Sequence, residues 1–311
     1  NNAIAAGLLD IPNERSSHET PVPRGGGIGI VVGVVLGVAA LYLAGRVPLT
    51  ALLITVTAAF LIGGVGFIDD RRDMSARARI VVHFAAAFLA IFWVANPVAG
   101  GSLETATFAL AAIFAIGIVW ALNLYNFMDG IDGIALQEGV FISLAGASLL
   151  WSSGSPWLGV LLCIAASCAA VLCWNWAPAK VFLGDVGSGF LGFLLAVIGI
   201  ATIAEVGLVP WLLLWGVFLV DATVTLFTRM LTGQCWYSAH RSHAYQRLAR
   251  KTGSHAAVSG GALAINVLWL FPWAYLVHSQ TISPLVCLTV ALAPLAVAAL
   301  MVRAGHPETD V

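Results

Sequence analysis

The sequence predicts an all-α fold, a polytopic bundle of membrane-spanning helices that forms a single domain over residues 1–311. Composition is the first observation: 60% of the residues are hydrophobic and 9% are charged, with a mean hydropathy of +0.96. A soluble domain carries roughly a quarter charged residues. The second observation is that apolar runs of about 20 residues, the length that crosses a bilayer, recur along nearly the whole chain. The third is the one-sided placement of the basic residues between those runs.

Ten apolar segments are long enough to be membrane spans. They cover residues 27–45, 49–68, 79–99, 105–125, 133–151, 156–177, 183–204, 207–229, 257–277 and 282–302. The chain begins with neither a methionine nor a signal peptide and opens almost directly on a polar loop. We therefore expect that an N-terminal piece precedes this sequence.

The basic residues predict the orientation of the bundle. If successive spans cross the membrane in opposite directions, thirteen of the 14 Lys and Arg residues lie on one side of the membrane and only Arg46 lies on the other. Basic loops stay in the cytoplasm, so the crowded side is expected to be cytoplasmic. On that side lie an N-terminal loop, residues 1–26, and a loop at 230–256 that contains histidine and arginine.

The net charge argues against nucleic-acid binding, and the cysteine spacing argues against disulfides and a cysteine-bound metal. The net charge of −1 gives no polybasic signal for nucleic acid. The five cysteines include no CxxC pair, and four of them lie in apolar spans, where cysteine is usually a small apolar residue. We expect no disulfide and no cysteine-bound metal.

Polar segments converge on the expected cytoplasmic face. They are residues 10–27, 67–73, 123–133, 180–189 and 234–251. Acids and arginines beside a span end are usually solvated anchors, and the glycines 25–27 alone fit a turn before a helix. The combination of the five segments favours a functional site.

Carboxylates dominate this set. Asp69, Asp70 and Asp73 lie within one helical turn, and Asp129 and Asp132 repeat a spacing of three residues. Such repulsion is costly unless a cation is present. Asp185 lies in the flexible segment Gly-Asp-Val-Gly-Ser, where a backbone can approach an oxyanion closely. Hard oxygen ligands on short hinges suit Mg²⁺ holding a diphosphate, whereas no group of ligands suits zinc.

Cationic side chains complete the predicted site. His240, Arg241 and His243 could grip phosphate oxygens opposite the carboxylates. Asp221 lies about two turns inside the eighth span, and Glu138 one to two turns inside the fifth. An ionisable residue at such depth indicates function, but a hydrogen-bonded structural role is equally compatible with both positions.

In order along the chain, the motifs resemble those of a known superfamily. The motifs are PNERSSHETPVPRGGG, DDxxD after a span, NxxNFMDGIDG and FLGDVGS. Together they resemble the polyprenyl-phosphate N-acetylhexosamine-1-phosphate transferases, which include the MraY, WecA and WbpL types. The resemblance covers essentially the whole chain. Because a span normally precedes the Pro-Asn-Glu-Arg segment in this family, the resemblance implies eleven spans.

The resemblance implies an enzyme of the bacterial inner membrane. Its reaction transfers an N-acetylated amino-sugar 1-phosphate from a UDP-sugar to undecaprenyl phosphate and releases UMP, with an active site facing the cytoplasm. Mg²⁺ is the expected cofactor, and Mn²⁺ could replace it. The family is also compatible with a homodimer.

Site residues are assigned by the same resemblance. Asp69, Asp70 and Asp185 would be catalytic, with Asp185 and Asp70 on the metal and Asp69 a candidate general base. Binding of the nucleotide, sugar and phosphates would fall to Asn126, Asp129, Asp132, Asp73, His240, Arg241, His243, Arg24 and His18. Arg15 also lies in the N-terminal loop that would complete the pocket.

Departures from the family patterns narrow the subclass. MraY proteins carry a three-histidine motif where this chain reads AHRSHAYQR, and a different pattern before the glycines. Both differences favour the WbpL type, which acts in O-antigen synthesis, over a muramoyl-pentapeptide phosphotransferase. A cation-coupled transporter is the alternative from another class, but its acids would lie at the midplane. A CDP-alcohol phosphotransferase would need a D-G-x-x-A-R signature, which is absent.

Overall fold

The computed structural model describes residues 9–10, 21–72, 74–95, 105–235, 238 and 240–307, and within them the protein is a bundle of helices. The elements are β1 (Leu9–Asp10), β2 (Val22–Pro23), α2 (Gly26–Leu43), α3 (Leu49–Thr57), η1 (Ala58–Gly63), α4 (Gly64–Asp69), α5 (Ala76–Ala95), α6 (Thr105–Phe127), α7 (Ile134–Leu149), α8 (Trp157–Asn175), α9 (Gly184–Ala201), α10 (Ile203–Val206), α11 (Leu208–Leu214), α12 (Gly216–Leu231), α13 (Ala244–Thr252), α14 (His255–Ile265), η2 (Asn266–Leu270), α15 (Phe271–His278) and α16 (Pro284–Met301). Both η segments are π-helical turns inside longer helices. Strands β1 and β2 form one short antiparallel pair, so the fold is nearly all-α.

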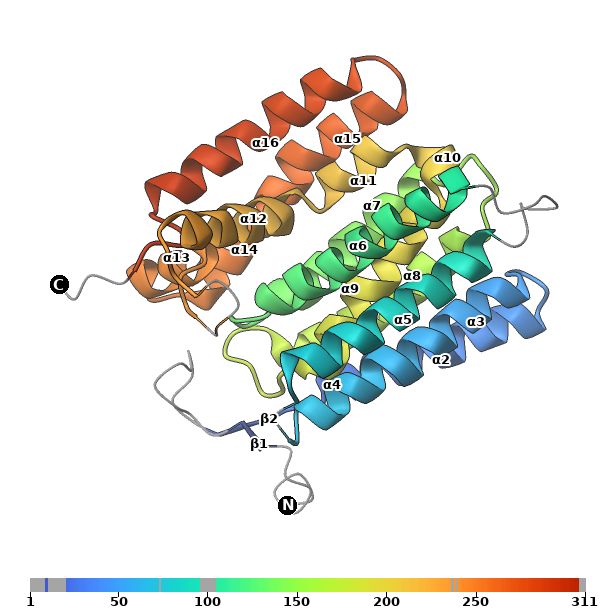
Figure 1. The fold of residues 1–311 in the computed structure, drawn as a ribbon, viewed down its shortest axis with the longest axis horizontal. Coiled ribbons are helices and arrows are strands. Elements are labelled where there is room, and N and C mark those ends of the chain that lie inside the picture. Colours follow the sequence, from blue (N-terminus) through green and yellow to red (C-terminus); the bar gives the residue numbers. More distant parts are fainter. Residues whose placement is uncertain are drawn as a thin grey trace.

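Across the bundle, the order of helices begins with α2 and α3 at one edge and reaches α15 and α16 at the opposite edge (Figure 1). Helix α9 lies at the centre: 67% of it is buried, whereas none of the other seven long apolar segments in the described chain exceeds 44%. Its neighbours include α2, α4 and α6. Because α9 is held on several sides, the side chains at its ends have fixed positions in the bundle.

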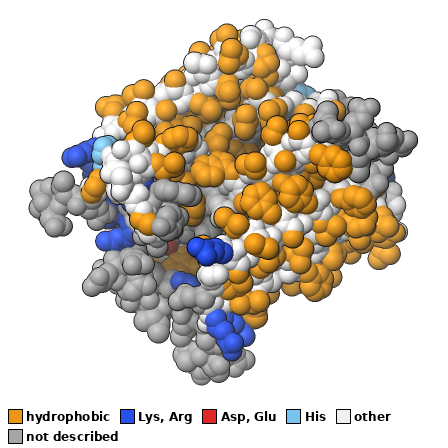
Figure 2. Space-filling model, in the orientation of Figure 1, with side chains coloured by type: hydrophobic (Ala, Val, Ile, Leu, Met, Phe, Trp, Pro, Cys, Tyr) orange, Lys and Arg blue, Asp and Glu red, His pale blue; other side chains and the backbone are white. Residues whose placement is uncertain are grey.

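Eight helical segments in the described part of the chain are long and apolar enough to cross a membrane. They are α2, α3 through α4, α5, α6, α8, α9, α14 through α15, and α16. Large apolar side chains cover most of the visible outer face, while Lys and Arg gather at one end (Figure 2). These features make the protein a multi-pass membrane protein.

Two of the expected spans differ from a single straight helix. Residues 133–151 form α7, which has 16 residues and is buried along most of its length. Residues 207–229 form α11 and α12, which meet at a bend of 78°. The break falls at Trp215, between the two helices. The first residue of α12, Gly216, packs against Leu270, where an added Cβ would lie 2.8 Å from a methyl group.

Glycines bring three helix ends together at the end of the bundle that carries Arg24, Asp70 and Asp185, which we call the charged end. A Cβ at Gly27 would lie 2.4 Å from the Gly187 nitrogen, so α2 begins in backbone contact with α9. A Cβ at Gly66 would lie 2.6 Å from the Asp185 carbonyl, so α4 approaches α9 equally closely. The close approach places the carboxylates at the C-terminal end of α4 beside the N-terminus of α9.

The segment before α2 is fixed to the loop before α9 by main-chain hydrogen bonds. The amides of Gly25 and Gly26 donate to the Phe182 carbonyl at 3.2 and 3.0 Å. The Phe182 amide donates in turn to the Pro23 carbonyl at 2.9 Å. Arg24 is thereby held at the mouth of the bundle.

Candidate active site

Acidic atoms show in a hollow at the charged end, with Lys and Arg side chains around it (Figure 2). The site draws on segments far apart in the sequence. They are the segment before α2, the junction of α4 and α5, the end of α6 with the turn after it, and the N-terminal end of α9. The sequence-predicted carboxylates Asp69, Asp70, Asp129 and Asp185 belong to this group.

Asp70 caps the N-terminus of α9. The amides of Asp185 and Val186 donate to its carboxylate oxygens at 3.3 and 3.4 Å, and Arg24 Nη1 lies 3.6 Å from Oδ1. A helix N-terminus favours negative charge. Burial nevertheless raises the pKa of Asp70, with the two amides and Arg24 acting in the opposite direction.

Asp69 forms an ion pair with Arg79, one turn into α5. Its other carboxylate oxygen accepts the Met74 amide at 2.8 Å. Arg79 Nη1 also lies 3.8 Å from Asp185 Oδ2, so one guanidinium joins the acids of two helices. In the sequence, Arg79 is only one of the basic residues that predict the topology. The short connection between α4 and α5 is the signal that could have identified its role.

Asn126 holds Asp185 from the end of α6. Its Nδ2 donates to Asp185 Oδ1 and to Ser188 Oγ, both at 3.0 Å. Ser188 Oγ donates to the Gly184 carbonyl at 3.1 Å. Sequence reasoning did not single out Ser188, although it lies one turn after Asp185 on the same face of α9. The carboxylate of Asp185 is therefore fixed from both sides, by Asn126 and by Arg79.

Asp129 is the least compensated acid of the cluster. It is half-buried, and its carboxylate has no hydrogen-bond or ion-pair partner among the described residues. Burial, together with repulsion from Asp185 and Asp70, raises the pKa of Asp129 well above its usual range. An acid in such surroundings is suited to a ligand that brings positive charge.

The donor set fits a divalent cation that is shared with phosphate. Four carboxylates, Asp69, Asp70, Asp129 and Asp185, face two guanidinium groups, which leaves a formal excess of two negative charges. Among the described residues, no three His, Cys, Asp or Glu side chains already form a metal cage. Mg²⁺ typically takes one or two carboxylates and completes its shell with water and substrate phosphates.

Asp132 ties the loop after α6 to its surroundings. Its Oδ2 accepts the Ala179 amide at 3.1 Å and lies 3.4 Å from His255 Nδ1. Its carbonyl accepts Ser259 Oγ at 2.8 Å. The described partners of Asp132 therefore come from the loop after α8 and from α14, not from the aspartate cluster.

Asp221 organises the histidine loop. Its Oδ1 accepts the Ala244 amide and its Oδ2 the Tyr245 amide, each at 2.9 Å, so Asp221 caps α13. His243 Nδ1 lies 3.2 Å from Oδ1. The structure thus gives this buried acid a positioning role, one of the two interpretations that the sequence left open.

Tyr245 Oη donates to the Phe127 carbonyl at 2.9 Å and joins α13 to the end of α6.

His240 stacks on His243 with ring centroids 4.9 Å apart. Burial, with the neighbouring His243 and Arg229, lowers the pKa of His240 to about 3. His240 is therefore neutral at pH 7, and it can serve as a hydrogen-bonding group but not as a cation. The Arg241 carbonyl accepts Arg250 Nη2 at 2.9 Å on the outer side of this loop.

Other predicted residues lie apart from the cluster. Glu138 is fully buried, and its Oε2 accepts Asn266 Nδ2 at 2.5 Å. This contact joins α7 to η2 and favours a structural role. His18, Asp73 and Arg15 fall outside the described residues.

Comparison with known proteins gives the family. Residues 51–203 match the family described as glycosyl transferase family 4. A Bacillus subtilis protein named "Probable undecaprenyl-phosphate N-acetylglucosaminyl 1-phosphate transferase" is 30% identical over 267 residues, 81% of this chain and 73% of its own length. The Escherichia coli "Undecaprenyl-phosphate alpha-N-acetylglucosaminyl 1-phosphate transferase" is 27% identical over 80% of this chain and 71% of its own length.

A third relative is named for a muramoyl-pentapeptide substrate. A Picosynechococcus protein named "Phospho-N-acetylmuramoyl-pentapeptide-transferase" is 32% identical over 217 residues, 64% of this chain and 56% of its own length. The matches therefore include both branches that the motifs resemble, and the N-acetylglucosaminyl relatives cover more of the chain. With the spans, the ordered motifs and these matches in agreement, the chain belongs to glycosyl transferase family 4.

Proposed function

We propose that the protein transfers an N-acetylated amino-sugar 1-phosphate from a UDP-sugar to undecaprenyl phosphate and releases UMP. The reaction would be the first membrane step in the synthesis of O-antigen or another cell-envelope polysaccharide. The observation that carries the proposal is the cluster of four carboxylates and two arginines at the mouth of an apolar bundle. Such a site lets a charged nucleotide meet a phosphate whose hydrocarbon chain stays in the bilayer.

The chemistry requires charge neutralisation more than a strong base. A lipid phosphate attacks the β-phosphorus of a diphosphate, and one phosphoanhydride replaces another. The barrier is dominated by bringing two anions together, so positioning and electrostatics supply most of the catalysis. Mg²⁺ bound by Asp185 and Asp70, or Mn²⁺ in its place, would neutralise the diphosphate.

Each acid has a separate role in this proposal. Asp69, held by Arg79 and the Met74 amide, would accept the remaining proton of the lipid phosphate. A weak base suffices because the second pKa of a phosphate monoester is near ~6. Asn126 fixes the orientation of Asp185. Asp70 would organise both the metal and the lipid phosphate from its place at the N-terminus of α9.

The remaining predicted residues would bind the donor. Asp129 and Asp132 flank the turn after α6 that would receive the nucleotide diphosphate, with Asp73 and His18 in the same pocket. Arg24, His240, Arg241 and His243 would contact the phosphates and the sugar. His240 would do so as a neutral group, because its pKa is lowered to about 3.

Orientation follows from the basic residues. We propose that the charged end faces the cytoplasm of a bacterial inner membrane, where UDP-sugars are made. The donor would be a UDP-linked N-acetylamino sugar, and the acceptor would reach the site from the bilayer.

Release of UMP tests the proposal. Purified protein would be offered undecaprenyl phosphate with UDP-N-acetylglucosamine, other UDP-N-acetylamino sugars or UDP-muramoyl-pentapeptide, with and without Mg²⁺. We expect Mg²⁺-dependent release with one amino sugar, lost in Asp185→Asn. The matched control is Glu205→Gln, which removes an exposed carboxylate outside the cluster and should retain activity. No release from folded protein with any donor would contradict the proposal. Activity only in sealed vesicles, as transport, would favour the transporter.

A further inference from the structure

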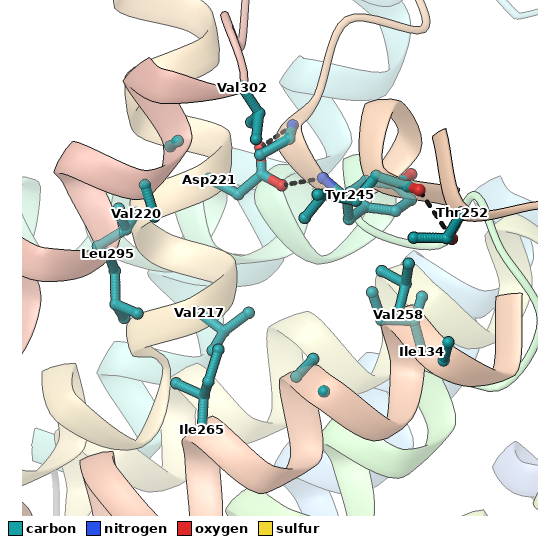
Figure 3. Close-up of a pocket in the computed structure, with 17 residues that line it drawn as sticks. Ile134, Val217, Val220, Asp221, Tyr245, Thr252, Val258, Ile265, Leu295 and Val302 are labelled. Atoms are coloured by element: carbon teal, nitrogen blue, oxygen red, sulfur yellow. Dashed lines mark hydrogen bonds between the residues drawn. The ribbon is translucent and has the colours of Figure 1, made fainter. Parts of the chain in front are cut away.

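An apolar cavity of about 400 Å³ lies between α12, α13, α14 and α16 (Figure 3). Its walls include Val217, Leu248, Gly261, Leu295 and Val302. The volume is within the ~300–1,000 Å³ that ligand pockets occupy. The aspartate cluster does not line it.

Water is a poor occupant of this cavity, because the polar side chains in its wall are already satisfied. Asp221 accepts the Ala244 and Tyr245 amides. Tyr245 Oη donates to the Phe127 carbonyl at 2.9 Å, and Thr252 Oγ1 donates to the Leu248 carbonyl at 2.8 Å. A buried water needs two to four polar partners, while an empty apolar space forfeits dispersion contacts. Both facts favour a hydrocarbon chain.

Two basic residues are the chain neighbours of residues that line the cavity. Thr252 of α13 lines the cavity, and Lys251 precedes it in the chain with an exposed side chain. Val302, which follows α16, also lines the cavity, and the exposed Arg303 follows it. Arg303 follows the end of α16, and α13, which carries Lys251, lies beside that end (Figure 1). Basic residues near an apolar space between membrane helices are a recognition pattern for acidic lipid headgroups.

We propose that this cavity binds one acyl chain of an acidic phospholipid, with the lipid phosphate near Lys251 and Arg303. Because the aspartate cluster does not line the cavity, the proposal places this site apart from the proposed site of the lipid acceptor. Tyr245 lines the cavity and bonds to Phe127 at the end of α6, so it stands between the cavity and the loop that carries Asp129. The proposal does not depend on the transferase activity.

Adjacent glycines of α14 provide a matched pair of variants. A Cβ at Gly260 or at Gly261 would meet nothing within 4 Å, so either position accepts a side chain. Gly261 lines the cavity and Gly260 does not. Gly261→Leu should therefore fill the cavity, whereas Gly260→Leu makes the same chemical change on another face of the helix. A third variant, Lys251→Gln with Arg303→Gln, removes the headgroup charges.

The test measures Tm in detergent and lipid retention by native mass spectrometry. The probes are phosphatidylglycerol, phosphatidylcholine, inorganic phosphate and undecaprenyl phosphate. We expect phosphatidylglycerol to raise Tm by about 5 °C more than phosphatidylcholine and to be retained by wild type and Gly260→Leu. The rise should be lost in Gly261→Leu and in the charge variant, whereas inorganic phosphate alone should have no effect.

Three results would overturn the proposal. Equal effects of the two phospholipids on Tm would rule out a site for the acidic headgroup. An equal rise of Tm with inorganic phosphate would indicate a simple anion site. Displacement of phosphatidylglycerol by undecaprenyl phosphate, with a raised KM for that acceptor in Gly261→Leu, would assign the cavity to the acceptor. If Gly261→Leu fails to fold, the charge variant decides the outcome alone.

Discussion

At the residue scale, Arg79 connects the acids of α4 to the acid of α9. It pairs with Asp69 and lies 3.8 Å from Asp185 Oδ2. Nothing in the sequence separates Arg79 from the three neighbouring arginines at positions 71, 72 and 77. Residue type alone predicted the carboxylates, because clustered acids are rare in a membrane protein. Which arginine compensates them depends on how the two helices fold together.

Arg79→Gln is predicted to lower kcat by about 100-fold, the usual order for losing one preorganised electrostatic group. The loss leaves Asp69 and Asp185 uncompensated and disturbs both orientations. Arg79→Lys keeps the charge and should lose less. Rates of UMP release would be compared with Arg77→Gln, an exposed position on the same helix. Equal rates for Arg77→Gln and Arg79→Gln would rule out this role.

Asp129→Asn is predicted to raise Tm by a few degrees while it abolishes the transferase activity. The substitution removes a carboxylate whose pKa is raised by burial and by repulsion from Asp185 and Asp70, and it keeps the shape of the side chain. Functional sites commonly carry such strain at a cost in stability. Thermal unfolding without ligand and UMP release would be measured together.

Asp221→Asn is the contrasting variant. It weakens the acceptor of the Ala244 and Tyr245 amides, so Tm should fall by an amount equivalent to about 1–3 kcal/mol. A higher Tm in Asp221→Asn than in Asp129→Asn would contradict both assignments.

At the scale of elements, the positions of the helices followed from hydropathy, but their interruptions did not. Apolar length predicted helices at all ten segments. Nothing in the apolar pattern of residues 207–229 marked the 78° bend between α11 and α12, beside which Gly216 packs against Leu270, a residue far away in the sequence. Similarly, the role of Asp221 depends on α13 folding back onto α12. Patterns within one segment carry no information on such long-range contacts.

The close approach of α4 to α9 yields an element-scale prediction. Gly66→Ala places a methyl 2.6 Å from the Asp185 backbone. It should destabilise the protein by about 1–3 kcal/mol through overpacking and displace Asp185. Gly64→Ala is the control, because nothing lies within 4 Å of its Cβ. Alanine should stabilise α4 there by about 0.5–1 kcal/mol. Thermal unfolding would show opposite signs for the two variants, and equal shifts would argue against the packing described.

At the scale of the whole molecule, the basic residues gather at the end that contains the aspartates (Figure 2). The histidine loop and the connection between α7 and α8 should then lie on opposite sides of the membrane. Exposed Cys235 in the histidine loop is predicted to resist an impermeant maleimide in intact cells and to react in inverted vesicles. Ser152→Cys, an exposed position after α7, should behave in the opposite way. Labelling of Cys235 in intact cells would contradict this orientation and place the histidine loop outside the cytoplasm.

Transfer of the β-phosphate is the most direct test of the proposed reaction. The protein would be incubated with undecaprenyl phosphate, Mg²⁺ and a UDP-N-acetylamino sugar labelled with ³²P at the β-position, beside Asp185→Asn and Glu205→Gln. Sugar 1-phosphate transfer predicts label in the organic phase with release of unlabelled UMP, lost in Asp185→Asn and kept in Glu205→Gln. Label that stays in water as UDP, while the sugar moves to the lipid, would contradict the account.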